Sequence, residues 1–120
     1  MARRILIVED NALAAGALQA LLETGGYVVH IAHSVEAAID ACSGEATDLM
    51  LLDLTLPDGD GLSVLPAVAA IGRLPTTTVA LTGHDDPIIT ARCRAAGCHD
   101  VLLKPVPARE LLARAAAWLA

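Results

Sequence analysis

The chain alternates between short apolar runs and longer stretches whose apolar residues have helical spacing, and this alternation limits its fold more than any other feature. The apolar runs of strand type occupy residues 5–8, 28–32, 49–52, 76–81 and 101–103. A stretch of helical character follows each run, over residues 12–23, 34–43, 62–71, 87–96 and 107–119. Repeated strand and helix units are typical of an α/β fold with a parallel sheet. We therefore predict one doubly wound α/β domain over residues 1–120.

Local signals in the sequence support this division into elements. The runs 5–8 and 49–52 are continuously apolar rather than alternating, which indicates strands covered by helices on both faces. Asn11 and Ser34 precede predicted helices and are favourable N-cap residues. Pro66 falls inside the helix predicted over 62–71, where it removes a backbone donor, so we expect this helix to kink or to start later.

The composition excludes several classes of protein. A chain of 120 residues with 55% hydrophobic content can form a core without metals or disulfides. Its net charge of −6 argues against direct binding to nucleic acid or to an anionic membrane. The apolar runs are too short for a signal peptide core or a membrane span. Since Cys42, Cys93 and Cys98 form no CxxC pair, we interpret them as packing residues and expect a cytoplasmic protein.

Polar residues follow the predicted strands at the points where the strands end. Glu9 and Asp10 follow the first strand, Asp53 the third, Thr82 the fourth and Lys104 the fifth. Because the carboxyl ends of parallel strands lie at one edge of a sheet, where open α/β folds bind ligands, we expect these side chains to meet in one site.

The chemistry of such a site favours a divalent cation and a phosphoryl group. Crowded carboxylates repel one another unless a cation lies among them, and Mg²⁺ prefers oxygen ligands of this kind. Lys104 and Thr82 supply the positive charge and the hydrogen-bond donor that the remaining phosphoryl oxygens require. Asp53 is a candidate nucleophile, because carboxylates form aspartyl phosphates.

Four motifs that contain these residues occur in a familiar order. They are ILIVEDN with Glu9 and Asp10, LMLLDLTLPDGDG with Asp53, VALTG with Thr82, and DVLLKPV with Lys104 and Pro105. Over essentially its whole length the chain resembles the receiver domain of bacterial two-component response regulators, of the chemotaxis receiver type. The resemblance implies a flavodoxin-like (βα)5 fold, with a five-stranded parallel sheet in the order 2-1-3-4-5 and helices on both faces.

The resemblance also implies roles for individual residues. Asp53 becomes the phosphoacceptor. Glu9, Asp10, Asp53 and the backbone carbonyl of Thr55 become the ligands of Mg²⁺. Thr82 becomes the hydroxyl that moves to meet the phosphoryl group.

Further positions follow from the same resemblance. Lys104 would contact a phosphoryl oxygen, and Pro105 would follow it through a bond that is commonly cis in the family. Gly61 is a candidate structural residue on other grounds, because the Pro, Asp and Gly residues of segment 56–61 predict a turn. The positions that tune the phosphoryl lifetime are Thr55 and His84.

Position 101 departs from the family pattern. Receiver domains usually carry Tyr or Phe three residues before the lysine, as a ring that turns inward on activation, whereas this chain has Val101. The alternative route for the switch is a rearrangement of backbone or loops.

The expected function is therefore that of a phosphoacceptor domain in a two-component phosphorelay. A histidine kinase or a histidine phosphotransfer protein would donate the phosphoryl group, and the modified domain would control the binding of an unknown downstream protein. In the family the first helix faces the phosphodonor, and residues 12–22 of this chain contain no charge. The domain is not expected to be an enzyme beyond catalysing its own phosphorylation and dephosphorylation.

Two alternatives remain open on the residues alone. One is a receiver-like interaction module that works without phosphorylation, which Val101 favours. The other is a Mg²⁺-dependent phosphatase of the haloacid dehalogenase type, which also uses Asp, Thr and Lys. Against this second alternative, Thr55 stands two residues after Asp53, where such an enzyme carries its general acid.

Overall fold

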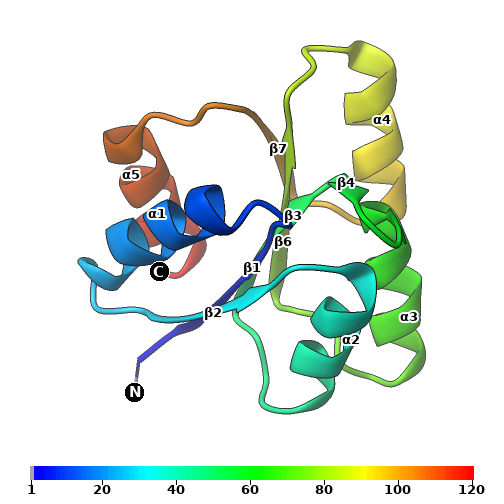
Figure 1. Ribbon diagram of the computed structural model, residues 1–120, viewed down its shortest axis with the longest axis horizontal. Helices are drawn as coiled ribbons and strands as arrows, with labels where there is room; N and C mark the ends of the chain where they lie inside the picture. The colour runs from blue at the N-terminus through cyan, green and yellow to red at the C-terminus, as the bar shows by residue number, and fades with distance from the viewer. Residues whose placement is uncertain (1) are drawn as a thin grey trace.

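A computed structural model describes residues 2–120 as a central parallel sheet between two layers of helices (Figure 1). Within these residues the sheet has five strands: β1 (Arg4–Val8), β2 (Val28–Ala32), β3 (Leu49–Asp53), β6 (Thr77–Thr82) and β7 (Asp100–Leu103). They are arranged in the order β2-β1-β3-β6-β7, and every neighbouring pair is parallel. The predicted strand order 2-1-3-4-5 is thus confirmed.

The helices cover both faces of this sheet, as predicted. They are α1 (Ala12–Glu23), α2 (Val35–Ser43), α3 (Val64–Ala70), α4 (Pro87–Ala96) and α5 (Ala108–Trp118). Helices α1 and α5 lie on one side, and α2, α3 and α4 lie on the other (Figure 1). Alternate residues of each strand face the two layers: Ile5 and Leu51 belong to the core below α1 and α5, whereas Leu6 and Leu52 belong to the opposite core.

Helices α1 and α2 begin directly after the N-cap residues that the sequence indicates. The side chain of Asn11 accepts a hydrogen bond from the Ala14 amide at the start of α1, and Ser34 accepts one from Ala37 at the start of α2. These contacts satisfy backbone donors that have no partner within the helix.

Pro66 delays the start of α3, which was one of its two expected effects. A short 3-10 helix over Gly61–Ser63 precedes α3, and the α-helix itself begins at Val64. Pro66 therefore lies in the first turn, where a missing backbone donor costs no hydrogen bond.

The segment between β3 and α3, predicted as a turn, contains a small antiparallel hairpin. Its strands are β4 (Thr55–Leu56) and β5 (Gly59–Asp60), paired through Thr55 with Asp60 and Leu56 with Gly59. We call residues 55–60 the hairpin. It begins two residues after Asp53 and therefore lies beside the edge of the sheet that was predicted to carry the site.

The cysteines are packing residues, as predicted. Cys42, Cys93 and Cys98 are all buried, and none forms a disulfide. Among residues 2–120, no helix has both the length and the apolar character needed to cross a membrane.

Candidate functional site

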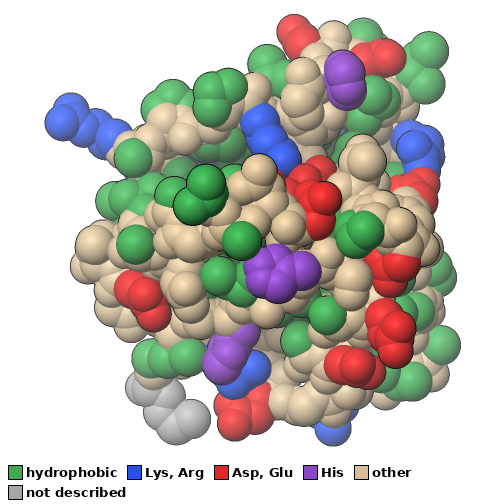
Figure 2. All heavy atoms as spheres, in the orientation of Figure 1, with side chains coloured by type: hydrophobic (Ala, Val, Ile, Leu, Met, Phe, Trp, Pro, Cys, Tyr) green, Lys and Arg blue, Asp and Glu red, His purple; other side chains and the backbone are tan. Residues whose placement is uncertain are grey.

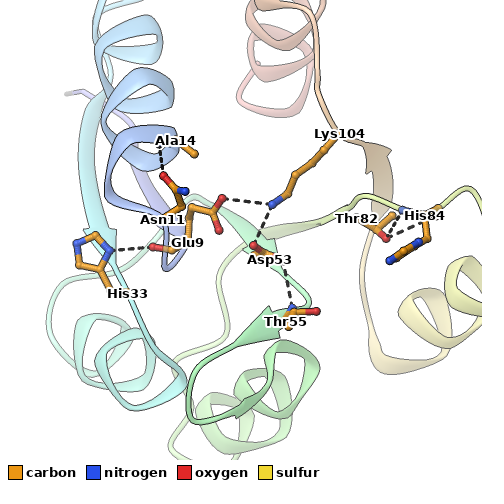
Figure 3. Close-up of polar contacts among 9 residues, drawn as sticks. All are labelled: Glu9, Asn11, Ala14, His33, Asp53, Thr55, Thr82, His84 and Lys104. Carbon is orange, nitrogen blue, oxygen red and sulfur yellow. Dashed lines mark hydrogen bonds and ion pairs between the residues drawn. The ribbon is translucent and has the colours of Figure 1, made fainter.

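Polar residues from four strands reach the same edge of the sheet. Glu9 directly follows β1, Asp53 ends β3, Thr82 ends β6 and Lys104 directly follows β7 (Figure 3). Because the strands are parallel, these carboxyl ends lie together. In the space-filling view, acidic side chains gather near the middle of the face shown, with a basic side chain beside them (Figure 2).

The Lys104 ammonium joins two buried carboxylates. Its Nζ lies 2.9 Å from Oδ2 of Asp53 and 3.2 Å from Oε1 of Glu9. Glu9 is 5% exposed and Asp53 is 9% exposed, whereas Asp10 is an exposed residue. Carboxylate oxygens of Glu9, Asp10 and Asp53 lie within 4.8 Å of one another. One ammonium group therefore faces three carboxylates.

Burial and the neighbouring side chains shift the pKa values of Glu9 and Asp53 in opposite directions. Burial raises the pKa of Glu9 to about 7, and the neighbouring Asp53 adds to this rise while Lys104 opposes it. Burial also acts to raise the pKa of Asp53, but the neighbouring Glu9 and hydrogen bonds from Lys104 and the Thr55 amide lower it overall. The site thus favours the ionised form of Asp53 at neutral pH and favours the protonated form of Glu9 more than an ordinary glutamate environment does.

The donor set has the chemistry that a hard divalent cation requires. Oε2 of Glu9 is buried and has no hydrogen-bond partner among the described residues. A buried polar atom without a partner is costly, and a cation among the three carboxylates would supply one while relieving their repulsion. Oxygen ligands from one or two carboxylates, with water, are what Mg²⁺ prefers.

Thr82 is turned toward the loop that follows it. Its hydroxyl oxygen accepts a hydrogen bond from the His84 amide at 3.1 Å and lies 3.5 Å from the His84 carbonyl oxygen. In Figure 3 the Thr82 side chain points to His84 rather than to Asp53. The structure therefore brings Glu9, Asp53 and Lys104 into contact and keeps the Thr82 hydroxyl bonded to the loop between β6 and α4.

Val101 and Pro105 lie on either side of Lys104 in the sequence. Val101 is half-buried in β7 and packs with Ile89 of α4 against the core on that side of the sheet. The Lys104–Pro105 peptide bond is cis.

Gly61 closes the hairpin against β3. Its amide donates a hydrogen bond to the Leu54 carbonyl at 2.8 Å, and a Cβ atom at this position would lie 2.0 Å from the carbonyl oxygen of Asp53. The close approach of two backbone segments, rather than an unusual backbone angle, is what requires glycine here.

Sequence reasoning missed two residues that hold the hairpin in place. The carboxylate of Asp58 accepts hydrogen bonds from the amides of Val35, at 2.8 Å, and Glu36, at 3.1 Å, and so caps α2 from outside. Arg92 of α4 forms an ion pair with Asp60. The sequence gives no signal for either contact, since each joins elements that are distant along the chain.

The Asp58 cap predicts a pH dependence of stability. The Val35 and Glu36 amides hold the pKa of Asp58 below its ordinary value of 3.8. A carboxyl group with a lowered pKa stabilises the fold above its ordinary pKa, and the effect is lost as pH falls through the folded value. We expect wild type to unfold at a higher temperature than Asp58→Asn at neutral pH, and the difference to shrink below about pH 4.

Thermal unfolding of both proteins from neutral pH down to about pH 3 would measure this difference. The asparagine retains one acceptor oxygen, so the substitution removes the charge and one of the two acceptors of the α2 amides, the same features that protonation of the carboxylate removes. A difference that stays constant over the whole range would contradict the assignment of the cap to the ionised form.

Comparison with known proteins decides the family. The family model described as the response regulator receiver domain matches residues 5–116. The chain belongs to the response regulator receiver domain family. The resemblance seen in the sequence motifs is thus confirmed.

Solved receiver domains have the same fold. A CheY-like response regulator receiver domain protein from Methanospirillum hungatei JF-1 is 28% identical, with a TM-score of 0.89, and the match covers 99% of this chain and 94% of that one. A two-component response regulator from Clostridium difficile is 26% identical, with a TM-score of 0.90 and coverage of 98% and 95%. The chemotaxis protein CheY4 of Vibrio cholerae, at 21% identity, has a TM-score of 0.91 over 99% and 100% of the two chains, a likeness that concerns the fold alone.

Membership in the receiver family establishes the general role of the chain. It is a receiver domain of the two-component response regulator type, a signalling domain whose family works with a phosphodonor and downstream effectors. No comparison favours the interaction module or the phosphatase.

Proposed function

We propose that this receiver domain, spanning residues 1–120, accepts a phosphoryl group on Asp53 in a Mg²⁺-dependent reaction. The observation that carries the proposal is the buried arrangement in which one Lys104 ammonium contacts both Asp53 and Glu9 while Oε2 of Glu9 has no partner among residues 2–120. Such a site suits the binding of a cation by its carboxylates together with an anionic phosphoryl group.

The metal ligands in this proposal are Glu9, Asp10, Asp53 and the backbone carbonyl of Thr55. Mg²⁺ bound there supplies charge neutralisation for the transferring phosphoryl group. A carboxylate oxygen of Asp53 forms a bond to phosphorus as the bond between phosphorus and the donor atom breaks. Lys104, already 2.9 Å from Asp53, stabilises negative charge on the phosphoryl oxygens.

Thr82 links the phosphoryl group to the rest of the domain. Its hydroxyl can donate a hydrogen bond to a phosphoryl oxygen only by giving up its present contacts with His84. Phosphorylation therefore releases the loop between β6 and α4. Because position 101 is valine, this loop carries the switch without a rotating aromatic ring, and Thr55 and His84 tune how long the phosphoryl group persists.

The partners in this proposal are a histidine kinase or a histidine phosphotransfer protein and a downstream protein. Hydrophobic side chains are exposed over α1 and α5 in Figure 2, and Leu13 of α1 is 88% exposed. A hollow of about 370 Å³ between α1 and α5 is lined by Leu18, Leu21 and Val106 and extends to Glu9 and Lys104. An apolar surface that reaches the phosphoacceptor site suits a phosphodonor protein.

The remaining parts of the proposal follow from charge and family. The net charge of −6 supports signalling through protein contact rather than through nucleic acid or a membrane. We place the domain in the cytoplasm and assign it no catalysis beyond its own phosphorylation and dephosphorylation.

Intact mass spectrometry tests the proposal directly. After incubation of the wild-type protein with acetyl phosphate and Mg²⁺, we expect the mass of one added phosphoryl group per chain, and no addition when EDTA replaces Mg²⁺. A folded protein that gains no phosphoryl group would overturn the proposal in favour of an interaction module. Continuous release of phosphate from many phosphate esters would overturn it in favour of a phosphatase.

A further inference from the structure

The hairpin holds Thr55 beside the phosphoacceptor. The Thr55 amide donates to Oδ1 of Asp53 at 3.2 Å, and the Gly61 amide donates to the Leu54 carbonyl at 2.8 Å. The hairpin has only two paired residues in each strand, and both residues of β5 are exposed. Two-stranded hairpins of this size have little stability of their own. The position of Thr55 therefore depends on what anchors the hairpin to the helices.

Side chains anchor the hairpin to two helices. At the tip, the carboxylate of Asp58 binds the first amides of α2. At the end of β5, Asp60 forms an ion pair with Arg92 of α4 and also accepts a hydrogen bond from the Leu62 amide at 3.0 Å. The hairpin is thus attached to α2 on one side and to α4 on the other.

The attachment to α4 crosses a hollow beside the site. This hollow, of about 320 Å³, lies between the hairpin and α4 and is lined by Thr55 and Asp60 from the hairpin, Thr82 and His84 from the end of β6 and its loop, and Arg92 from α4. Leu54 and Ile89 also line this hollow and pack against the core, in which Leu56 of the hairpin is buried. Strand β5 is exposed, and its side-chain contact with α4 is the ion pair between Asp60 and Arg92.

We infer that Arg92 is a positioning residue for the metal site: through Asp60 it holds the hairpin, and with it the Thr55 backbone, where Mg²⁺ binding at Asp53 requires it. The inference rests on the proposed function, which makes the Thr55 carbonyl a ligand. It adds that α4 and the metal site are coupled through this ion pair. Because coupling is reciprocal, Mg²⁺ binding must strengthen the attachment of α4 by the same factor by which that attachment strengthens Mg²⁺ binding.

The direction in which loss of Arg92 changes the Mg²⁺ affinity distinguishes positioning from long-range electrostatics. Removing a positive charge near a cation site should strengthen cation binding if only long-range charge matters. If Arg92 positions Thr55, Arg92→Ala should weaken binding instead. We expect the Mg²⁺ dissociation constant to rise by about twofold to fivefold, the range that a solvent-exposed ion pair is worth.

Arg94→Ala is the matched control. Arg94 lies on the same helix, its side chain is 56% exposed against 55% for Arg92, and it pairs with Asp100 of β7 rather than with the hairpin. Its removal deletes the same charge, so we expect unchanged or slightly tighter Mg²⁺ binding. Arg92→Lys, which retains a charge for Asp60, should recover most of the wild-type affinity.

Asp60→Asn completes a double-mutant cycle. The asparagine keeps an oxygen for the Leu62 amide and removes only the charge that pairs with Arg92. If both substitutions act by breaking one ion pair, the loss in the double variant should be smaller than the product of the two single losses.

Calorimetric titration of Mg²⁺ into the metal-free proteins measures these affinities, with the chemical shift of the Thr55 amide as a second readout. We expect Arg92→Ala, but not Arg94→Ala, to weaken Mg²⁺ binding and to move the Thr55 amide signal. If wild type binds Mg²⁺ and Arg92→Ala binds it equally or more tightly, the inference is overturned and the proposed function stands. A wild-type protein that binds no Mg²⁺ would overturn both, and the phosphorylation assay would show this separately.

Discussion

The Asp53→Asn variant is expected to react with acetyl phosphate at least about a hundredfold more slowly than wild type, so that no phosphoryl addition is detected. An amide oxygen is a far weaker nucleophile than the carboxylate that Lys104 and the Thr55 amide hold ionised in wild type. The substitution nearly preserves shape and keeps an oxygen for the Thr55 amide, so the fold should persist. Intact mass and a thermal unfolding curve on the same sample measure both properties.

Two further variants control for this result. Asp40→Asn makes the same chemical change at an exposed position of α2 and should be phosphorylated like wild type. Asp10→Asn changes an exposed member of the acidic cluster, so it should weaken Mg²⁺ binding, and phosphorylation of Asp53 should then require a higher Mg²⁺ concentration. An Asp53→Asn protein that still gains one phosphoryl group would move the acceptor to another residue.

The fold and the centre of the site can be predicted from the sequence because both follow from the spacing of apolar residues along the chain. Continuous apolar runs such as 5–8 and 49–52 indicate buried parallel strands, and the polar residues that end the runs must then share one edge of the sheet. Glu9, Asp53 and Lys104 are therefore expected to lie together, and Lys104 contacts both carboxylates in the structure.

The parts that the sequence did not indicate depend on packing between distant elements. The segment 56–61 is predicted as a turn because all its residues after Leu56 are Pro, Asp or Gly, but composition does not show that Asp58 caps α2 or that Asp60 faces Arg92. The present partner of the Thr82 hydroxyl is likewise a matter of conformation. A motif identifies the residue, whereas the contact with His84 is a property of this state of the loop.

Position 61 connects the stability of the fold to the geometry of the site. Gly61 is buried where the end of the hairpin meets β3, and its backbone is not in the left-handed region that favours glycine. A positive φ is therefore not the reason for glycine at this position. The obstacle to a side chain is the Asp53 carbonyl oxygen, 2.0 Å from where a Cβ atom would lie, which no rotation of that side chain can relieve.

Gly61→Ala is accordingly expected to destabilise the protein by about 1–3 kcal/mol, the usual cost of forcing an extra carbon into a packed site. Either the hairpin or the end of β3 must move, and both carry groups of the proposed metal site, so phosphorylation by acetyl phosphate should fall as well. Urea denaturation measures the loss of stability as a lower midpoint with an unchanged slope. A variant as stable and as readily phosphorylated as wild type would show that the hairpin yields without cost.

Gly16→Ala makes the same chemical change and is expected to change the stability in the opposite direction. Gly16 lies inside α1, and a Cβ atom there meets no other atom within 4 Å. Alanine in a helix interior is favoured over glycine, so this variant should gain up to about 1 kcal/mol of stability. Since both variants add one methyl group, a loss at Gly61 together with a gain at Gly16 would assign the loss to the contact with Asp53 and exclude a general effect of replacing glycine.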